Sequence, residues 1–236
     1  MNHIGELNEQ PLHAALKAWY TRPGDQIEAS VDGGQRGYVI DIVRDDDLLI
    51  EIQTGNFSSI KRKLHDLVKR HPVRLIYPIA VEKWLLKLPK KGWDGPRRRK
   101  SPKRGRVEVV FAELVSFPQL LLEDNFSLEV VLIQEEEVRR YAGAKHWRKK
   151  GWVTVERRLL DVVAQRLFET PSDMSALLPV ETPQQFTTLD LAEMLASPRW
   201  LAQKMAYCLQ EMGEIIRVGK RGRSYLYSRI DAVEEF

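Results

Sequence analysis

Residues 38–54 read YVIDIVRDDDLLIEIQT, two runs rich in β-branched residues on either side of three aspartates. Runs of this kind joined by a short polar turn predict a β-hairpin with strands over 38–44 and 48–54. Side chains alternate along a strand, so the register decides whether Asp41 and Glu51 share a face. A three-residue loop at the aspartates sets the two acids opposite each other, whereas a two-residue loop puts them on opposite faces. The triple aspartate favours the longer loop.

Two opposed carboxylates in an otherwise apolar hairpin repel each other, so a neutralising partner is expected. A divalent cation is the simplest partner, because hard oxygen ligands suit Mg²⁺ and Mn²⁺. We therefore expect Asp41 and Glu51 to be metal ligands. The first predicted helix offers a third acid in Glu9, with Glu6 one turn earlier. One of these acids points toward the sheet, or both only stabilise the positive N-terminal end of their helix.

The hairpin lies within a regular order of elements. Apolar residues at helical spacing predict amphipathic helices over 8–20 and 57–70. Short runs rich in β-branched residues predict further strands over 26–31 and 73–77, the second of them stopped by Pro78. The resulting order is helix, three strands, helix, strand.

This order, with an acid on the first helix, Asp on the second strand and Glu-x-Gln on the third, resembles the PD-(D/E)xK nuclease superfamily. The resemblance covers about residues 6–78. It implies an α/β fold in which a mixed central sheet is flanked by helices, as in restriction endonucleases. It also implies Mg²⁺-dependent hydrolysis of phosphodiesters, with Asp41 and Glu51 as metal ligands and Glu9 as the assisting acid.

The superfamily places a lysine two positions after the glutamate, where it activates or positions the attacking water. That position is Gln53 here, and glutamine neither carries charge nor takes a proton. Members with glutamine there, or with the lysine moved to the following helix, resemble this arrangement. Lys61 and Lys63 are therefore candidates for a moved cation, or are solvated charges on the helix surface.

A strongly basic tract spans residues 87–106, with ten lysine or arginine residues, one acid, three prolines and three glycines. Prolines and glycines at this density predict a long loop. The loop is either a solvated segment or localisation-like tract, or an arm that binds phosphates by releasing counterions from nucleic acid. The rest of the chain is net negative although the whole chain is +4, and we favour the arm because of the segments that flank it. Its candidate DNA contacts are Arg97, Arg98, Arg99, Lys100, Lys103 and Arg104.

The second half of the chain contains further predicted helices and strands. We expect a helix over 107–117, a buried strand over 128–133 and a long helix over 154–168. A second basic cluster precedes Gly151, so the sequence predicts a nuclease-like domain over 1–150 and a DNA-binding domain over 151–236.

Residues 186–229 resemble a winged helix-turn-helix, with a short helix capped at Thr187 or Thr188, a second helix ending at Gly213, and a basic hairpin. The predicted helix over 154–168 is the first helix of this unit. In this family the second helix enters the major groove and the wing touches phosphates. Some winged helices bind only protein, and that alternative stays open. The DNA contacts implied by the resemblance are Arg199, Gln203, Lys204, Lys220, Arg221 and Arg223.

The amino-acid composition excludes several other classes of protein. A chain of 236 residues with 43% hydrophobic content is globular, and its single cysteine excludes an internal disulfide. The longest apolar runs are shorter than the roughly 20 residues of a membrane helix, so we expect a cytoplasmic protein without a membrane partner. The five histidines show no zinc-ligand spacing.

These patterns together predict a Mg²⁺- or Mn²⁺-dependent DNA endonuclease whose C-terminal winged helix holds the DNA. The alternative, supported by Gln53, is a catalytically inactive nuclease-fold regulator or assembly factor that still binds DNA. An RNA substrate ranks lower, because no aromatic sheet motif is present. A homodimer would place two cuts on a duplex.

Overall fold

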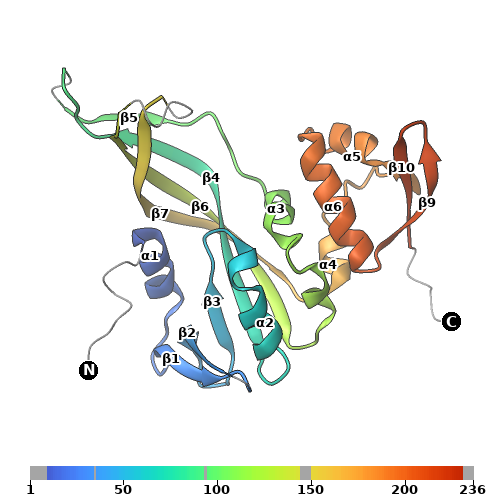
Figure 1. Ribbon diagram of the computed structural model, residues 1–236, viewed down its shortest axis with the longest axis horizontal. Helices are drawn as coiled ribbons and strands as arrows, with labels where there is room; N and C mark the ends of the chain where they lie inside the picture. The colour runs from blue at the N-terminus through green and yellow to red at the C-terminus, as the bar shows by residue number, and fades with distance from the viewer. Residues whose placement is uncertain (1–9, 35, 93–94, 144–149, 231–236) are drawn as a thin grey trace.

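A mixed sheet of seven strands forms the centre of the described part of the protein (Figure 1). The computed structural model describes residues 10–34, 36–92, 95–143 and 150–230. The strands lie in the order β1-β2-β3-β4-β6-β7, with β5 on β4. Strands β3, β4 and β6 are mutually parallel, and the other neighbours are antiparallel. The strands are β1 (Gln26–Asp32), β2 (Gly37–Val43), β3 (Leu49–Ile52), β4 (Val73–Lys87), β5 (Arg97–Lys100), β6 (Phe126–Tyr141) and β7 (Trp152–Phe168).

The acidic hairpin β2–β3 has the register that the sequence favours. Ile42 pairs with Ile50. The next position along the two strands therefore sets Asp41 opposite Glu51. The three aspartates form the turn, and Asp47 has a φ of 64°, the left-handed conformation common in three-residue hairpin loops. The longer loop is thus confirmed.

Helices cover both faces of this sheet. On one face α1 (Pro11–Tyr20) buries Leu12, Leu16 and Tyr20 against isoleucines of β2, β3 and β4. The opposite face packs against shorter helices and 3₁₀ turns that follow β3 and β5. These are η1 (Phe57–Ser59), α2 (Lys61–Leu67), η2 (Val107–Val110), α3 (Phe111–Leu114) and η3 (Pro118–Leu122). The expected α/β fold with a mixed central sheet flanked by helices is confirmed.

Strand β4 continues past Pro78, where the sequence predicts that it stops. Its last pairing with β3 joins Ile52 to Ile76, and its pairing with β5 begins at Trp84 and Lys100. Pro78 lies between these two stretches. A proline, which has no N–H, is tolerated in a strand where one neighbouring strand is missing.

The basic tract over 87–106 is partly a strand and not one long loop. Its four consecutive cations over 97–100 form β5, which pairs antiparallel with the end of β4. All four side chains are exposed. The described residues on either side of β5, which include the prolines and glycines, stay irregular. Trp93, which the sequence offers either for stacking on a base or for pinning the loop to the body of the protein, lies outside the described residues.

The stretch predicted as a long helix over 154–168 is strand β7, so that prediction is wrong. Its pairing with β6 contains three register shifts, which break the period-two alternation that marks a strand in sequence. The hairpin β6–β7 joins Leu128 to Phe168 at one end and reaches the turn near Gly151 at the other. A domain boundary at Gly151 would divide this hairpin, because the large sheet extends to the end of β7.

The C-terminal unit follows β7 and contains a second, smaller sheet in the order β8-β10-β9 (Figure 1). The helix, turn, helix and hairpin predicted over 186–229 are present. Thr187 caps α5 by accepting bonds from the amides of Leu189 and Asp190, and Gly213 follows α6 with a φ of 79°. The elements are α4 (Pro171–Ser175), β8 (Gln185–Thr187), α5 (Thr188–Met194), α6 (Arg199–Glu211), β9 (Ile215–Arg221) and β10 (Ser224–Arg229).

This unit packs directly on the helices that cover the large sheet. Lys204 on α6 donates to the carbonyl of Ala112 at 2.6 Å, and Arg106 donates to the carbonyl of Leu195 at 2.7 Å. One continuous apolar core includes residues of both parts. Across the described residues, no helix is long and apolar enough to span a membrane.

Candidate functional site

Asp41 and Glu51 meet at the point where β2 and β3 separate. The carboxylate of Asp41 reaches toward β3, and its Oδ2 accepts a hydrogen bond from the amide of Ile52 at 2.8 Å. The ring of His13, on α1, contacts the same oxygen at 3.2 Å. Asp41 therefore connects the first helix to the end of the central hairpin.

Glu51 is almost fully buried, with 8% of its surface exposed. Lys63, on α2, donates to Glu51 Oε2 at 2.6 Å and also to the carbonyl of Val39 at 2.6 Å. One ammonium group thus ties α2 to both strands of the hairpin. It also provides a positive charge beside the carboxylate pair.

The two carboxyl groups differ in acidity. The pKa of Glu51 is raised to about 7, because burial and the charge of Asp41 raise it more than Lys63 lowers it. Burial acts on Asp41 in the same direction, but the hydrogen bond and charge of His13, the Ile52 amide and Lys63 outweigh it. The pKa of Asp41 is therefore lowered from its ordinary value.

The structure brings together Asp41, Glu51 and Lys63 but not Lys61. Lys61 begins α2 and is exposed, so Lys63 is the cation that reaches the pair. Glu9 lies outside the described residues. His13 was missed by sequence reasoning, although its position three residues before the buried Leu16 places it beside the apolar face of an amphipathic helix.

Gln53, at the position of the superfamily lysine, faces the loop that follows β3. Its amide nitrogen donates to the carbonyl of Gly55, and it lies 3.3 Å from both Asn56 O and Ser59 Oγ. Gln53 therefore holds the loop that leads into η1. In the described part of the chain, no group of three or more His, Cys, Asp and Glu side chains is placed to hold a metal.

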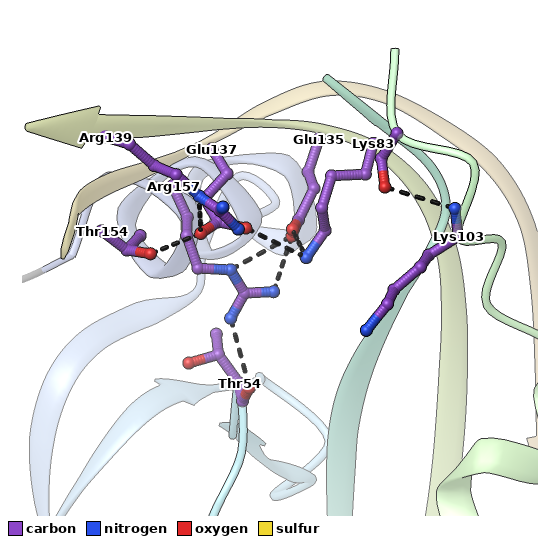
Figure 2. Close-up of polar contacts among 9 residues, drawn as sticks. Thr54, Lys83, Lys103, Glu135, Glu137, Arg139, Thr154 and Arg157 are labelled. Atoms are coloured by element: carbon purple, nitrogen blue, oxygen red, sulfur yellow. Dashed lines mark hydrogen bonds and ion pairs between the residues drawn. The ribbon is translucent and has the colours of Figure 1, made fainter. Parts of the chain in front are cut away.

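A cavity of about 860 Å³ opens between the large sheet, the segment after β5 and the start of α6. A network of ion pairs forms one wall (Figure 2). Glu135 on β6 is fully buried, and its two oxygens lie 2.6 Å from Lys83 Nζ and 2.6 Å from Arg157 Nη2. Glu137, two positions along β6, accepts from Arg139 at 2.8 Å and from the hydroxyl of Thr154. The sequence shows these charges, but their convergence depends on the full length of β4 and β6, of which only residues 73–77 and 128–133 were predicted as strands, and on β7, which was predicted as a helix.

The cations predicted to contact DNA from the basic tract fall into two groups. Arg98 pairs with Glu136 at 2.7 Å, and both Lys100 and Arg104 lie 2.8 Å from Glu82. Arg99 and Lys103 line the cavity, as does Arg104. Arg97 is exposed on β5. The tract therefore places part of its charge on the cavity and part in ion pairs on the sheet.

The candidate contacts in the C-terminal unit are also divided. Lys204 is turned toward α3 and is half-buried, so it holds α6 in place. Gln203, Lys220 and Arg223 are exposed. Arg199 contacts Ser224 Oγ at 3.1 Å, and Arg221 pairs with Asp190 at 2.9 Å.

Two exposed aromatic side chains on α6 were missed by sequence reasoning. Trp200 is 50% exposed and Tyr207 45% exposed. In a sequence, large aromatic residues at helical spacing usually indicate a buried helix face. Here Leu201, Met205 and Leu209 form the buried stripe of α6, and Trp200 and Tyr207 lie outside it.

The chain is similar to a known family and to a bacterial relative. A family described as "Domain of unknown function (DUF8091)" matches residues 10–169, which contain the whole large sheet and both candidate carboxylates. An uncharacterized protein of Treponema pallidum (strain Nichols) is 28% identical over 228 residues, covering 96% of this chain and 87% of that protein. No solved structure matches the chain significantly. Because the family match spans more than half of its length, the chain belongs to the DUF8091 family.

Proposed function

We propose that this chain is a metal-dependent DNA endonuclease with its catalytic site at Asp41 and Glu51. The observation that carries the proposal is the opposed carboxylate pair, with Glu51 buried, Asp41 half-buried and Lys63 beside them. The element order α1-β1-β2-β3-α2-β4 supports the proposal, because it is the order that the resemblance to PD-(D/E)xK nucleases implies.

The residues present suit a divalent cation. Glu51 is buried and Asp41 half-buried, and one lysine and one histidine contact the pair. Burial and the charge of Asp41 raise the pKa of Glu51 to about 7 despite Lys63, so a further positive charge would stabilise the ionised pair. Asp41 and Glu51 are the residues that would hold Mg²⁺ or Mn²⁺. When bound, such an ion supplies a water of lowered pKa and stabilises charge on the phosphate.

The chain's own residues orient and neutralise the site. His13 and the Ile52 amide fix the carboxylate of Asp41. Lys63 takes the place of the superfamily lysine, since it contacts Glu51 from the following helix. Its ammonium is the group available to stabilise negative charge that develops on a phosphate.

The C-terminal unit is proposed to bind duplex DNA as a winged helix. The order α4-β8-α5-α6-β9-β10, with exposed Gln203 on α6 and exposed Lys220 and Arg223 near the tip of the hairpin, supports this role. Cations at such a tip contact phosphates, which position the protein without reading sequence.

A DNA-binding protein without catalysis is the second candidate, and Gln53 favours it. Its amide is directed to the loop over 55–59 and supplies no charge. In this alternative Lys63 serves only to neutralise the buried pair.

One experiment separates the two candidates. The pure protein is incubated with supercoiled and linear DNA in Mg²⁺, Mn²⁺ or EDTA, beside Asp41→Asn, Glu51→Gln and the control Asp45→Asn. Asp45 is an exposed acid in the turn of the same hairpin. We expect metal-dependent cleavage that the first two substitutions abolish and the control retains. Equal cleavage by all four proteins would overturn the assignment, and DNA binding without cleavage in any metal would support the second candidate.

A further inference from the structure

The cavity between the large sheet and α6 has an unusual charge balance. Among its described lining residues, six are cationic and one, Glu137, is acidic. The cations are Lys83, Arg99, Lys103, Arg104, Arg139 and Arg157. They come from four separate strands and a loop, so the fold gathers them from distant parts of the sequence. A concave surface lined by one sign of charge attracts a ligand of the opposite sign.

Part of this charge is not neutralised within the protein. Lys83 and Arg157 share the buried Glu135, and Arg139 pairs with Glu137. Arg99 and Lys103, both exposed, form no ion pair with an acidic side chain in the described part of the chain. In Figure 2 no dashed line joins the amino group of Lys103 to the Glu135 network. The cavity therefore presents two unpaired cations above a wall of fixed, paired ones.

Apart from Thr54 and Ser101, the rest of the lining is apolar or aromatic, which a site for a small inorganic anion does not need. Tyr77, Ile79, Leu85 and Leu201 contribute to it, and Trp200 lies at the side formed by α6 with half of its surface exposed. Cationic grooves combined with exposed aromatic side chains are typical of sites for single-stranded nucleic acid, in which bases stack and phosphates meet lysine or arginine. A cavity of about 860 Å³ lies in the ~300–1,000 Å³ range of sites that enclose small ligands, so it holds a short stretch of one strand and does not enclose a duplex.

The cavity reaches the end of the strand that carries Glu51. Thr54 is one of its lining residues, and the carbonyl of Thr54 accepts a hydrogen bond from Arg157 Nη1 at 3.4 Å (Figure 2). Thr54 follows Glu51 by three residues, about 10 Å along an extended chain. A strand lying in the cavity thus comes close to the carboxylate pair.

We propose that this cavity binds one strand of nucleic acid, with its phosphates on Arg99 and Lys103 and a base against Trp200. The further statement that this strand is led to Asp41 and Glu51 rests on the proposed function. The proposal that the cavity binds a strand is independent of the proposed function, because binding needs neither metal nor cleavage.

The test measures binding in EDTA by fluorescence anisotropy. The probe is a labelled oligothymidylate of about ten nucleotides, within the ~4–16 nucleotides that such sites cover. We compare wild type with Arg99→Ala/Lys103→Ala, with Trp200→Ala and with the control Lys69→Ala/Arg70→Ala. Lys69 and Arg70 are exposed cations outside the cavity lining, with side chains 69% and 56% exposed.

Removing two phosphate contacts should lower the slope of log K against log salt concentration by about 1.4, since each contact on a single strand contributes about 0.7. Trp200→Ala should weaken binding about tenfold, the loss expected for one stacked base. The control should leave affinity and slope near wild type. Thermal unfolding by circular dichroism checks that each variant is folded.

Three results would overturn the inference: unchanged binding in both cavity variants, an equal loss in the control, or a matched duplex that competes as well as the single strand and responds to the same substitutions. A cavity that binds as expected in a protein that never cleaves DNA would contradict the proposed nuclease and leave the inference intact. Cleavage that requires Asp41 and Glu51 but is unchanged in the cavity variants would support the proposed nuclease and contradict the inference.

Discussion

The titration of one residue, Glu51, makes the stability of the protein depend on pH. Burial raises the pKa of Glu51 from 4.5 to about 7, so between these values the folded state binds more protons than the unfolded state. The contribution of Glu51 to stability therefore falls as the pH rises through this window. In Glu51→Gln the titration is absent, and its free energy of unfolding in urea and EDTA should fall less than that of wild type between about pH 5 and about pH 7. Asp45→Asn should follow the wild-type profile, and a profile of Glu51→Gln parallel to wild type would contradict the assignment.

The lysine that reaches this pair has a separate effect on stability. Lys63→Met leaves the buried Glu51 without its ion-pair partner and beside the charge of Asp41, and breaking a buried ion pair in this way costs about 3 kcal/mol. The measurement is chemical unfolding at neutral pH. Lys61→Met, on the exposed start of the same helix, should change stability by less than about 0.5 kcal/mol. The double variant Lys63→Met/Glu51→Gln should regain much of the loss, and equal effects of the two lysine substitutions would show that Lys63 has no special role.

For single residues, the sequence predicts the opposed carboxylates Asp41 and Glu51 more successfully than it predicts the side chains that contact them. The opposition of Asp41 and Glu51 depends only on the length of one turn, which three consecutive aspartates indicate. The choice between Lys61 and Lys63 depends on the phase of α2, and this helix starts only after a 3₁₀ turn that sequence periodicity does not reveal. The contact of His13 with Asp41 depends on how α1 packs across the sheet, and no local pattern encodes it.

At the scale of elements, local patterns predict those parts of the fold that local interactions determine. The hairpin β2–β3 and the helix pair α5–α6 follow from turns, caps and apolar stripes. Strand β7 was read as a helix because its bulges disturb the alternation, and its neighbour in space decides its conformation. Strand β4 continues through Pro78 for a similar reason, since the gap between β3 and β5 that tolerates a proline exists only in the assembled sheet.

The cap of α5 is an element whose contribution can be measured. Thr187 accepts bonds from the amides of Leu189 and Asp190, while the carboxylate of Asp190 accepts from the amide of Thr187 and pairs with Arg221. Thr187→Ala should therefore lower stability by about 1 kcal/mol. Thr187→Ser keeps the capping oxygen and should lose much less. Chemical unfolding measures both variants, and equal losses would mean that packing of the threonine methyl, and not the cap, is responsible.

At the scale of the whole molecule, the C-terminal unit and the large sheet share one apolar core. The family match ends at residue 169, just after β7, which suggests a separable domain. The packing argues against separation, because Phe117 and Leu120 beside the sheet belong to the same buried cluster as Met205 and Leu209 of α6. A chain shortened to residues 1–169 would expose this cluster to water.

We therefore expect the full chain to unfold in one transition, with coincident curves from tryptophan fluorescence and far-ultraviolet circular dichroism. The chain shortened to residues 1–169 should unfold at a lower temperature or aggregate, because its exposed apolar surface lacks a partner. Arg106→Ala tests the same contact without deletion: it removes the hydrogen bond to the carbonyl of Leu195 and should cost about 1.5 kcal/mol while keeping a single transition. Two separate transitions in the full chain, with only one of them shifted by Arg106→Ala, would mean that the two units fold independently.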